Sequence, residues 1–84
     1  MDKGLYDKGL KLAKEEGYKE DEMEIWAKGY AEGRMKGRDD GWAYYGGYGN
    51  EPHESNGPYD EGYKKGYWYG RDEGFEDREI YGWQ

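Results

Sequence analysis

The chain of 84 residues contains no cysteine, so it can form neither a disulfide framework nor a thiolate metal site. It also has no valine, a single phenylalanine, three leucines and two isoleucines. Leu, Ile, Val and Phe together fall below the roughly 20% that, with high net charge, is typical of disordered chains. Aliphatic residues alone therefore cannot supply the core.

A long apolar run is missing as well. No stretch approaches the roughly 18–20 apolar residues of a membrane span, and the charged N-terminus lacks the apolar region of a signal peptide. We therefore expect a cytoplasmic protein with no membrane partner.

Groups for catalysis are equally scarce. Ser55 is the only hydroxyl residue besides the tyrosines, and His53, between Glu51 and Glu54, is the only histidine. A metal site or a catalytic base needs further convergent groups, and no nucleotide-binding glycine loop is present. The sequence predicts no enzyme, no metal and no cofactor.

The net charge of −7 argues against autonomous binding to nucleic acid, because that affinity comes mainly from Lys and Arg on phosphates. An acidic surface suits a basic partner instead, such as a host protein that normally binds DNA or RNA.

Aromatic residues are abundant, with eleven tyrosines and four tryptophans. Each buries about 150–250 Å² when packed. We expect residues 1–84 to form one small domain with an aromatic core.

Glycine recurs every fourth residue in two stretches that lie 33 residues apart, and a large side chain follows each glycine. Gly-Arg-Asp-Asp-Gly-Trp (37–42) and Gly-Arg-Asp-Glu-Gly-Phe (70–75) are near copies. The two rows consist of Gly29, Gly33, Gly37 and Gly41, and of Gly62, Gly66, Gly70 and Gly74.

A spacing of four indicates helices, here over 22–45 and 59–79. Glycine costs about 1 kcal/mol against alanine inside a helix, so two such rows indicate that something requires the absence of side chains. Close packing of two helices along an i±4 row is such a requirement. The sequence predicts an all-α fold: an antiparallel helical hairpin, quasi-two-fold, packed through its glycine rows.

The remaining segments are assigned around this hairpin. Residues 1–21 are predicted as an N-terminal acidic helix, with a break near Gly17 and Asp21 as N-cap of the next helix. Residues 46–58 form the connection, with Pro58 in the first turn of the second helix. The apolar tail 80–84 is expected to fold back onto the core.

Two acidic runs are the candidate partner-binding surface, because carboxylates on a helical frame can imitate phosphates and occupy a basic groove. Such runs can also simply form a solvated helix face and complement the helix dipole. The candidates are Glu15, Glu16, Glu20, Asp21, Glu22, Glu24, Asp72, Glu73, Glu76 and Asp77.

Arg34, Arg38 and Arg71 lie in the aromatic row instead of the charged one. They are expected to stack on neighbouring rings and to pair with Asp39, Asp40 or Asp72. The alternative is that they bind a phosphate or an acidic surface.

The phrase Gly-Tyr-x-x-Gly-x-x-x-Gly-Arg (29–38), the turn at Gly57-Pro58-Tyr59 and the aromatic–glycine steps after it resemble ribosome modulation factor. They are also similar to small phage-encoded proteins with Gly-Tyr helix repeats. The resemblance covers about residues 26–75. Ribosome modulation factor binds ribosomal RNA and is basic, whereas this chain is acidic. The phage likeness implies an accessory or counter-defence protein that binds a host protein, and if the chain is phage-encoded its location is the cytoplasm of the bacterial host cell.

Three functions remain open at this point. The first is an acidic protein-binding module that inhibits or modulates a host nucleic-acid-processing or defence protein. The second is a structural protein that self-associates, for example as a homodimer, through its glycine rows. The third is a ribosome- or RNA-associated factor that uses the basic residues Arg34, Arg38, Lys64, Lys65 and Arg71.

Overall fold

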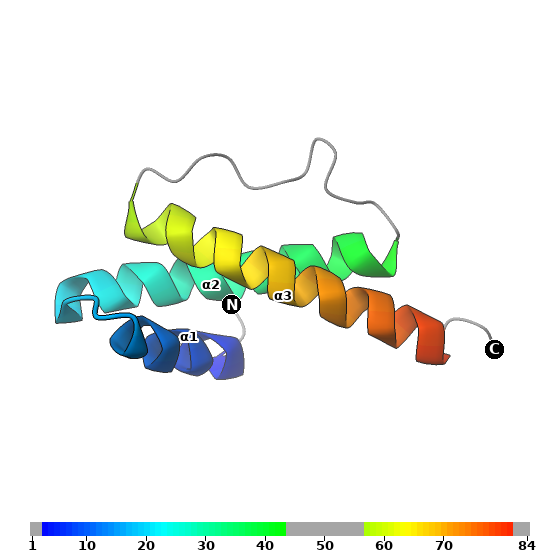
Figure 1. Cartoon of the computed structure of the whole chain (residues 1–84), viewed down its shortest axis with the longest axis horizontal. Helices are drawn as coiled ribbons and strands as arrows, with labels where there is room; N and C mark the ends of the chain where they lie inside the picture. The colour runs from blue at the N-terminus through cyan, green and yellow to red at the C-terminus, as the bar shows by residue number, and fades with distance from the viewer. Residues whose placement is uncertain (1–2, 44–56, 82–84) are drawn as a thin grey trace.

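The fold consists of three helices in the computed structural model, which describes residues 3–43 and 57–81 (Figure 1). The helices are α1 (Lys3–Glu15), α2 (Glu20–Trp42) and α3 (Pro58–Tyr81), and the described residues contain no strand. The predicted all-α class, with a pair of glycine-rich helices and an N-terminal helix, is confirmed. Pro58 is the first residue of α3, as predicted.

The two glycine rows face each other across the α2–α3 contact. A side-chain carbon at any of the eight glycines would lie 2.0–2.3 Å from a backbone carbonyl oxygen of the opposite helix. Real side chains do not approach so closely, so only glycine permits this separation. The predicted reason for the glycine rows is confirmed.

The predicted antiparallel direction is wrong, because α2 and α3 run parallel. Gly29 meets the carbonyl of Tyr59 and Gly41 meets that of Arg71, so both residue numbers rise together. In an antiparallel pair one number would fall as the other rose. Figure 1 shows both helices starting at the same end of the molecule and running the same way.

The length of the connection explains why this arrangement is possible. Since Tyr59 lies level with Gly29, the chain must return about 20 Å from Trp42, at 1.5 Å per helical residue. The 15 residues from 43 to 57 reach about 50 Å when extended. A short turn would have forced the helices to be antiparallel, but this connection does not.

The parallel pair has internal two-fold symmetry that relates each residue of α2 to the residue 33 positions later in α3. Gly29 meets Tyr59, which is three residues before Gly62, and Gly62 meets Trp26, which is three residues before Gly29. The same reciprocity holds for the other three pairs of glycines. The axis therefore runs along the helices, and each helix presents its glycines to the backbone of the other.

Side chains on the two flanks of the pair follow the same symmetry. Arg34 donates to Glu73 at 3.1 Å across a separation of 39 residues, and Tyr67 donates to Asp40 at 2.8 Å across 27. Residues 67 and 40 are the symmetry equivalents of 34 and 73. We call these cross-helix pairs the rungs of the α2–α3 pair.

Helix α1 packs on the first half of α2 and runs against it (Figure 1). Gly9 is buried there, and a side-chain carbon at Gly9 would lie 2.9 Å from Cα of Ala27. At the end of α1, Ala13 joins Trp26 and Tyr30 in the buried core, and the Trp26 and Tyr30 rings are stacked with centroids 5.5 Å apart. The expected aromatic core is thus present.

The boundary between α1 and α2 differs from the prediction. Helix α1 ends at Glu15 instead of residue 21, and Gly17 follows with φ of 88°, a left-handed value that favours glycine. Lys19, not Asp21, occupies the N-cap, and it forms no side-chain cap. Asp21 lies inside the first turn of α2, where its Oδ1 accepts from the backbone N–H of Glu22 at 3.1 Å.

The end of the chain also departs from the prediction. Helix α3 continues through Tyr81, two residues beyond the predicted end, and the side chain of Ile80 is 64% exposed. Ile80 therefore does not fold back onto the core. The last three residues of the predicted tail (82–84) and His53 lie outside the described residues.

Candidate functional site

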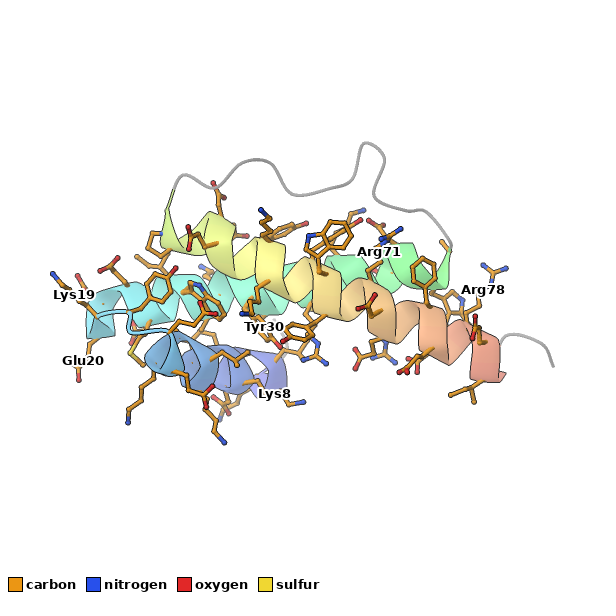
Figure 2. All side chains as sticks on the ribbon, in the orientation of Figure 1. Lys8, Lys19, Glu20, Tyr30, Arg71 and Arg78 are labelled. Atoms are coloured by element: carbon orange, nitrogen blue, oxygen red, sulfur yellow. The ribbon has the colours of Figure 1, made fainter. Side chains whose placement is uncertain are left out.

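The corner between α1 and α2 is the most acidic part of the described chain. Residues 15–24, which we call the acidic corner, contain six carboxylates and only Lys19 as a cation. Glu22 is half-buried, and the other five carboxylates are exposed. In Figure 2 Lys19 and Glu20 project from one tip of the molecule, which is 44 Å long.

Helix stability explains only part of this charge. Glu20, Asp21 and Glu22 lie in the first turn of α2, where negative charge interacts favourably with the helix dipole. Glu15 and Glu16 lie at the opposite kind of terminus, the C-terminal end of α1, where negative charge is unfavourable. The corner therefore concentrates carboxylates beyond what the two helices need.

The second predicted acidic group lies elsewhere. Residues 72–77 belong to the C-terminal half of α3, toward the end marked by Arg78 in Figure 2, opposite Glu20. Glu73 and Asp77 of this group form ion pairs with Arg34 and Arg38, at 3.1 and 3.0 Å. The structure does not bring the two acidic groups together, and it employs two of their carboxylates in the α2–α3 contact.

Only Glu16 of the acidic corner forms an ion pair among the described residues. Its Oε1 lies 2.7 Å from Nζ of Lys65 in α3, and this hydrogen bond raises the pKa of Lys65. The other carboxylates of the corner, and exposed Asp72 and Glu76 in α3, have no ion-pair partner within the part of the chain that the structure describes. The unpaired carboxylates of the corner are Glu15, Glu20, Asp21, Glu22 and Glu24.

A groove of about 510 Å³ lies beside the acidic corner. Helices α1 and α3 both pack extensively on α2 but make little contact with each other, which leaves this space between the corner and α3. The groove is lined by Glu16, Trp26, Glu61, Lys64, Lys65, Trp68, Tyr69 and Asp72. Its volume is in the range of about 300–1,000 Å³ typical of ligand sites.

Two polar contacts close one end of the groove. Besides the pair between Glu16 and Lys65, the Tyr18 hydroxyl donates to Glu61 across the gap. Burial, with this hydrogen bond and the charges of Glu61 and Glu16, raises the pKa of Tyr18 to about 12. These contacts fix the acidic corner against α3.

The indole N–H of Trp26, at the edge of the groove, is buried and has no hydrogen-bond partner among the described residues. It lies close enough to the Tyr18 oxygen to lower the pKa of that hydroxyl somewhat, without completing a hydrogen bond. Its symmetry equivalent, Tyr59, donates to Glu32 of the opposite helix. The residue equivalent to Glu32 is Lys65, which cannot accept, so the symmetry leaves Trp26 unsatisfied.

The apolar surface of the groove comes from Trp68 and Tyr69, whose side chains are 36% and 50% exposed. Exposed aromatic residues beside a charged rim are typical of protein-binding hot spots. They were not predicted individually as site residues. The signal was present in the sequence, where Tyr69 interrupts an otherwise charged row of the second helix.

The predicted arginines are structural in two of three cases. Arg34 donates to the Tyr30 hydroxyl at 2.7 Å, and its guanidinium lies 5.8 Å from the Tyr30 ring. Stacking is thus as expected. The acids paired with Arg34 and Arg38 are Glu73 and Asp77 instead of Asp39, Asp40 or Asp72, because the parallel direction changes which residues meet.

The helix-packing glycines are used entirely within the chain. All eight are buried, and each lies against the backbone of the partner helix. Self-association through these rows would require the α2–α3 pair to separate.

Within residues 3–43 and 57–81 no three His, Cys, Asp or Glu side chains converge in a way that could hold a metal ion. In the same residues no helix combines the length and the apolar character needed to cross a membrane.

Comparison with protein-family models, curated proteins and solved structures finds no match for this chain. The resemblance to ribosome modulation factor and to phage Gly-Tyr proteins therefore stays a prediction.

Proposed function

We propose that this chain is a small acidic protein-binding module that engages a basic host protein through its acidic corner. The observation that supports this most is the placement of Glu15 and Glu16 at the C-terminal end of α1, beside the acidic first turn of α2. Both the helix dipole and mutual repulsion oppose this placement. Lys65 already offsets the charge of Glu16, and a basic partner would turn the remaining charges of the corner into favourable contacts.

The groove adds exposed apolar surface to the charges of the acidic corner. Trp68 and Tyr69 offer exposed aromatic surface next to Glu16, so a partner could bury apolar area and meet carboxylates at once. Buried aromatic contacts contribute most of the affinity of protein interfaces, and rim charges mainly contribute association rate and specificity.

The proposed partner class is a protein that normally binds nucleic acid, because its basic surface is complementary to a row of carboxylates. Binding there would exclude the nucleic acid and so inhibit or modulate a processing or defence protein. A phage counter-defence role by nucleic-acid mimicry is the biological setting that we propose.

The alternatives have less support. Arg34 and Arg38, two of the cations expected to bind RNA, are held by Glu73 and Asp77. The glycine rows expected to drive self-association are buried between α2 and α3. Arg34, Arg38 and the glycine rows are therefore not available without rearrangement.

The test is affinity capture from a bacterial lysate at low and high salt, with two matched variants. One removes two exposed, unpaired charges of the acidic corner (Glu20→Gln with Glu24→Gln). The other removes two exposed charges from the far part of α3, outside the groove (Glu76→Gln with Glu79→Gln). We expect high salt and the corner variant to abolish capture of a specific protein, because screening and neutralisation weaken the same contacts.

The far variant should retain the partner, and both variants should keep the helical circular dichroism of the parent chain. Capture that is equal in all three proteins, or that does not depend on salt, would overturn the proposal.

A further inference from the structure

The guanidinium of Arg71 lies between two aromatic rings on the side of α3. Its Cζ is 5.2 Å from the centroid of Trp68 and 5.0 Å from that of Phe75. These residues precede and follow Arg71 by about one turn, so the helix itself holds the planar group in place. Figure 2 shows Arg71 midway along the molecule, well away from Glu20.

Arg71 differs from the other three arginines in its polar contacts. Arg34 and Arg38 pair with carboxylates, and Arg78 donates to the carbonyl oxygen of Trp42 at 2.7 Å. Arg71 forms no ion pair within the described residues, and its Nε is buried without a hydrogen-bond partner. Within residues 3–43 and 57–81 this half-buried cation therefore has no counter-charge.

The internal symmetry explains the missing carboxylate. Arg71 is the equivalent of Arg38, 33 residues earlier, and Arg38 pairs with Asp77. The position equivalent to Asp77 is residue 44, which is a tyrosine. Arg38 has a carboxylate partner in Asp77, but the sequence provides no carboxylate at the equivalent position for Arg71.

The terminal nitrogens of Arg71 are not among the buried atoms that lack a hydrogen-bond partner. Since they also form no hydrogen bond or ion pair within the described residues, they keep access to solvent. A guanidinium with an open edge binds carboxylate or phosphate through two parallel hydrogen bonds. Stacking on Trp68 and Phe75 reduces the entropy lost when such a ligand binds, because the planar group is already held. The neighbouring acid, Asp72, is exposed and does not pair with Arg71.

We propose that Arg71 is a binding site for an oxyanion, a carboxylate or a phosphate, which its terminal nitrogens hold while Trp68 and Phe75 fix the guanidinium. This site shares Trp68 with the groove but lies apart from the acidic corner, and oxyanion binding there does not depend on the function proposed above. It gives an acidic protein one preorganised contact for an anionic ligand.

The test is an NMR titration of the ¹⁵N-labelled chain that follows the Nε–H signals of its arginines. The probes are inorganic phosphate and acetate, at constant ionic strength with chloride as the reference anion. We expect a saturable shift of the Arg71 signal, while the signals of Arg34 and Arg38 stay in place because carboxylates already occupy them. A response to both probes identifies a general oxyanion site. A response to phosphate alone identifies a phosphate site, and a response to acetate alone identifies a carboxylate site.

Two variants separate binding from a general effect of salt. In the parent chain the indole N–H signal of Trp68 should also shift when an oxyanion binds, because Arg71 stacks on that ring. Arg71→Lys keeps the charge but loses the planar edge and the stacking, so this indole signal should no longer respond. Arg38→Lys is the matched control and should leave the Arg71 response intact. The proposal is wrong if the Arg71 signal of the parent chain moves no more than those of Arg34 and Arg38.

Discussion

Oδ2 of Asp40 accepts a hydrogen bond of 2.8 Å from the hydroxyl of Tyr67, and both side chains are buried, at 4% and 0% exposure. The other oxygen, Oδ1, lies 3.3 Å from Nζ of Lys36, which is largely exposed. Tyr67→Phe would leave a buried acceptor unsatisfied, so we expect the free energy of unfolding to fall by about 1–3 kcal/mol. Denaturant unfolding measures the loss.

Tyr69→Phe is the matched control, because Tyr69 lies two residues away in the same helix and is half exposed. Its loss should stay within about 0.5 kcal/mol. Equal losses for the two variants would show that the buried hydrogen bond does not contribute to stability.

Adding one methyl group to the α2–α3 contact should be costly. In Gly33→Ala the new carbon would lie 2.2 Å from the carbonyl oxygen of Tyr63, and the backbone there cannot move aside without separating the helices. Despite the higher helix propensity of alanine, we expect the free energy of unfolding to fall by about 1–3 kcal/mol, as in overpacked cores. Thermal unfolding followed by circular dichroism measures it.

The control is Gly4→Ala, in the exposed first turn of α1, which should cause no loss. If Gly33→Ala were as harmless as Gly4→Ala, the close approach of the helices would be refuted.

The parallel direction can be measured with pairs of spin labels, because the chain has no cysteine of its own to interfere. Lys28, Lys64 and Glu79 are exposed positions suited to labelling. In parallel helices position 28 of α2 lies near position 64 of α3. Position 79 lies about 22 Å further along α3, because the 15 residues between 64 and 79 rise 1.5 Å each. We expect the 28–64 distance to be clearly the shorter; an antiparallel pair would reverse the order.

Stability should fall at alkaline pH because of two tyrosines. Burial and hydrogen bonds to Glu61 and Glu32 raise the pKa of Tyr18 and of Tyr59 to about 12, from an ordinary value of 10.0. Between these values the unfolded chain loses protons that the folded chain keeps, so folding becomes less favourable as pH rises. The contribution is complete below pH 10 and disappears as pH approaches about 12.

Unfolding midpoints across this pH window, with the ultraviolet titration of the phenols, check the prediction. Tyr59→Phe keeps the ring and removes one titrating group, so its stability should depend less steeply on pH. An unchanged slope would mean that Tyr59 titrates alike in the folded and unfolded chain.

The spacing of Gly33 and Gly66 was enough to predict two helices in close contact, because glycine inside a helix is unfavourable without such a reason. It could not give their direction. A row of residues four apart forms the same groove whether the partner helix runs up or down. The direction depends on the reach of the connection and on the fit of both flanks, which involve the whole chain.

That direction also decided which site predictions failed. Glu73 and Asp77 look like free surface charges in sequence, and they become partners of Arg34 and Arg38 only in the parallel arrangement. The acidic corner was visible in sequence as a run of carboxylates. The groove beside it was not, because it arises from the limited contact between α1 and α3.

The parallel pair has a consequence for folding kinetics. In an antiparallel hairpin the contacts nearest the turn join residues close in sequence, and the helices can zip together from there. Here every contact along the glycine rows joins residues 30 to 36 positions apart. Forming the first contact therefore requires nearly the whole loss of chain entropy that closing the loop causes. Each later contact causes little further loss of entropy. The two helices should dock in a single cooperative step, with no partly zipped intermediate.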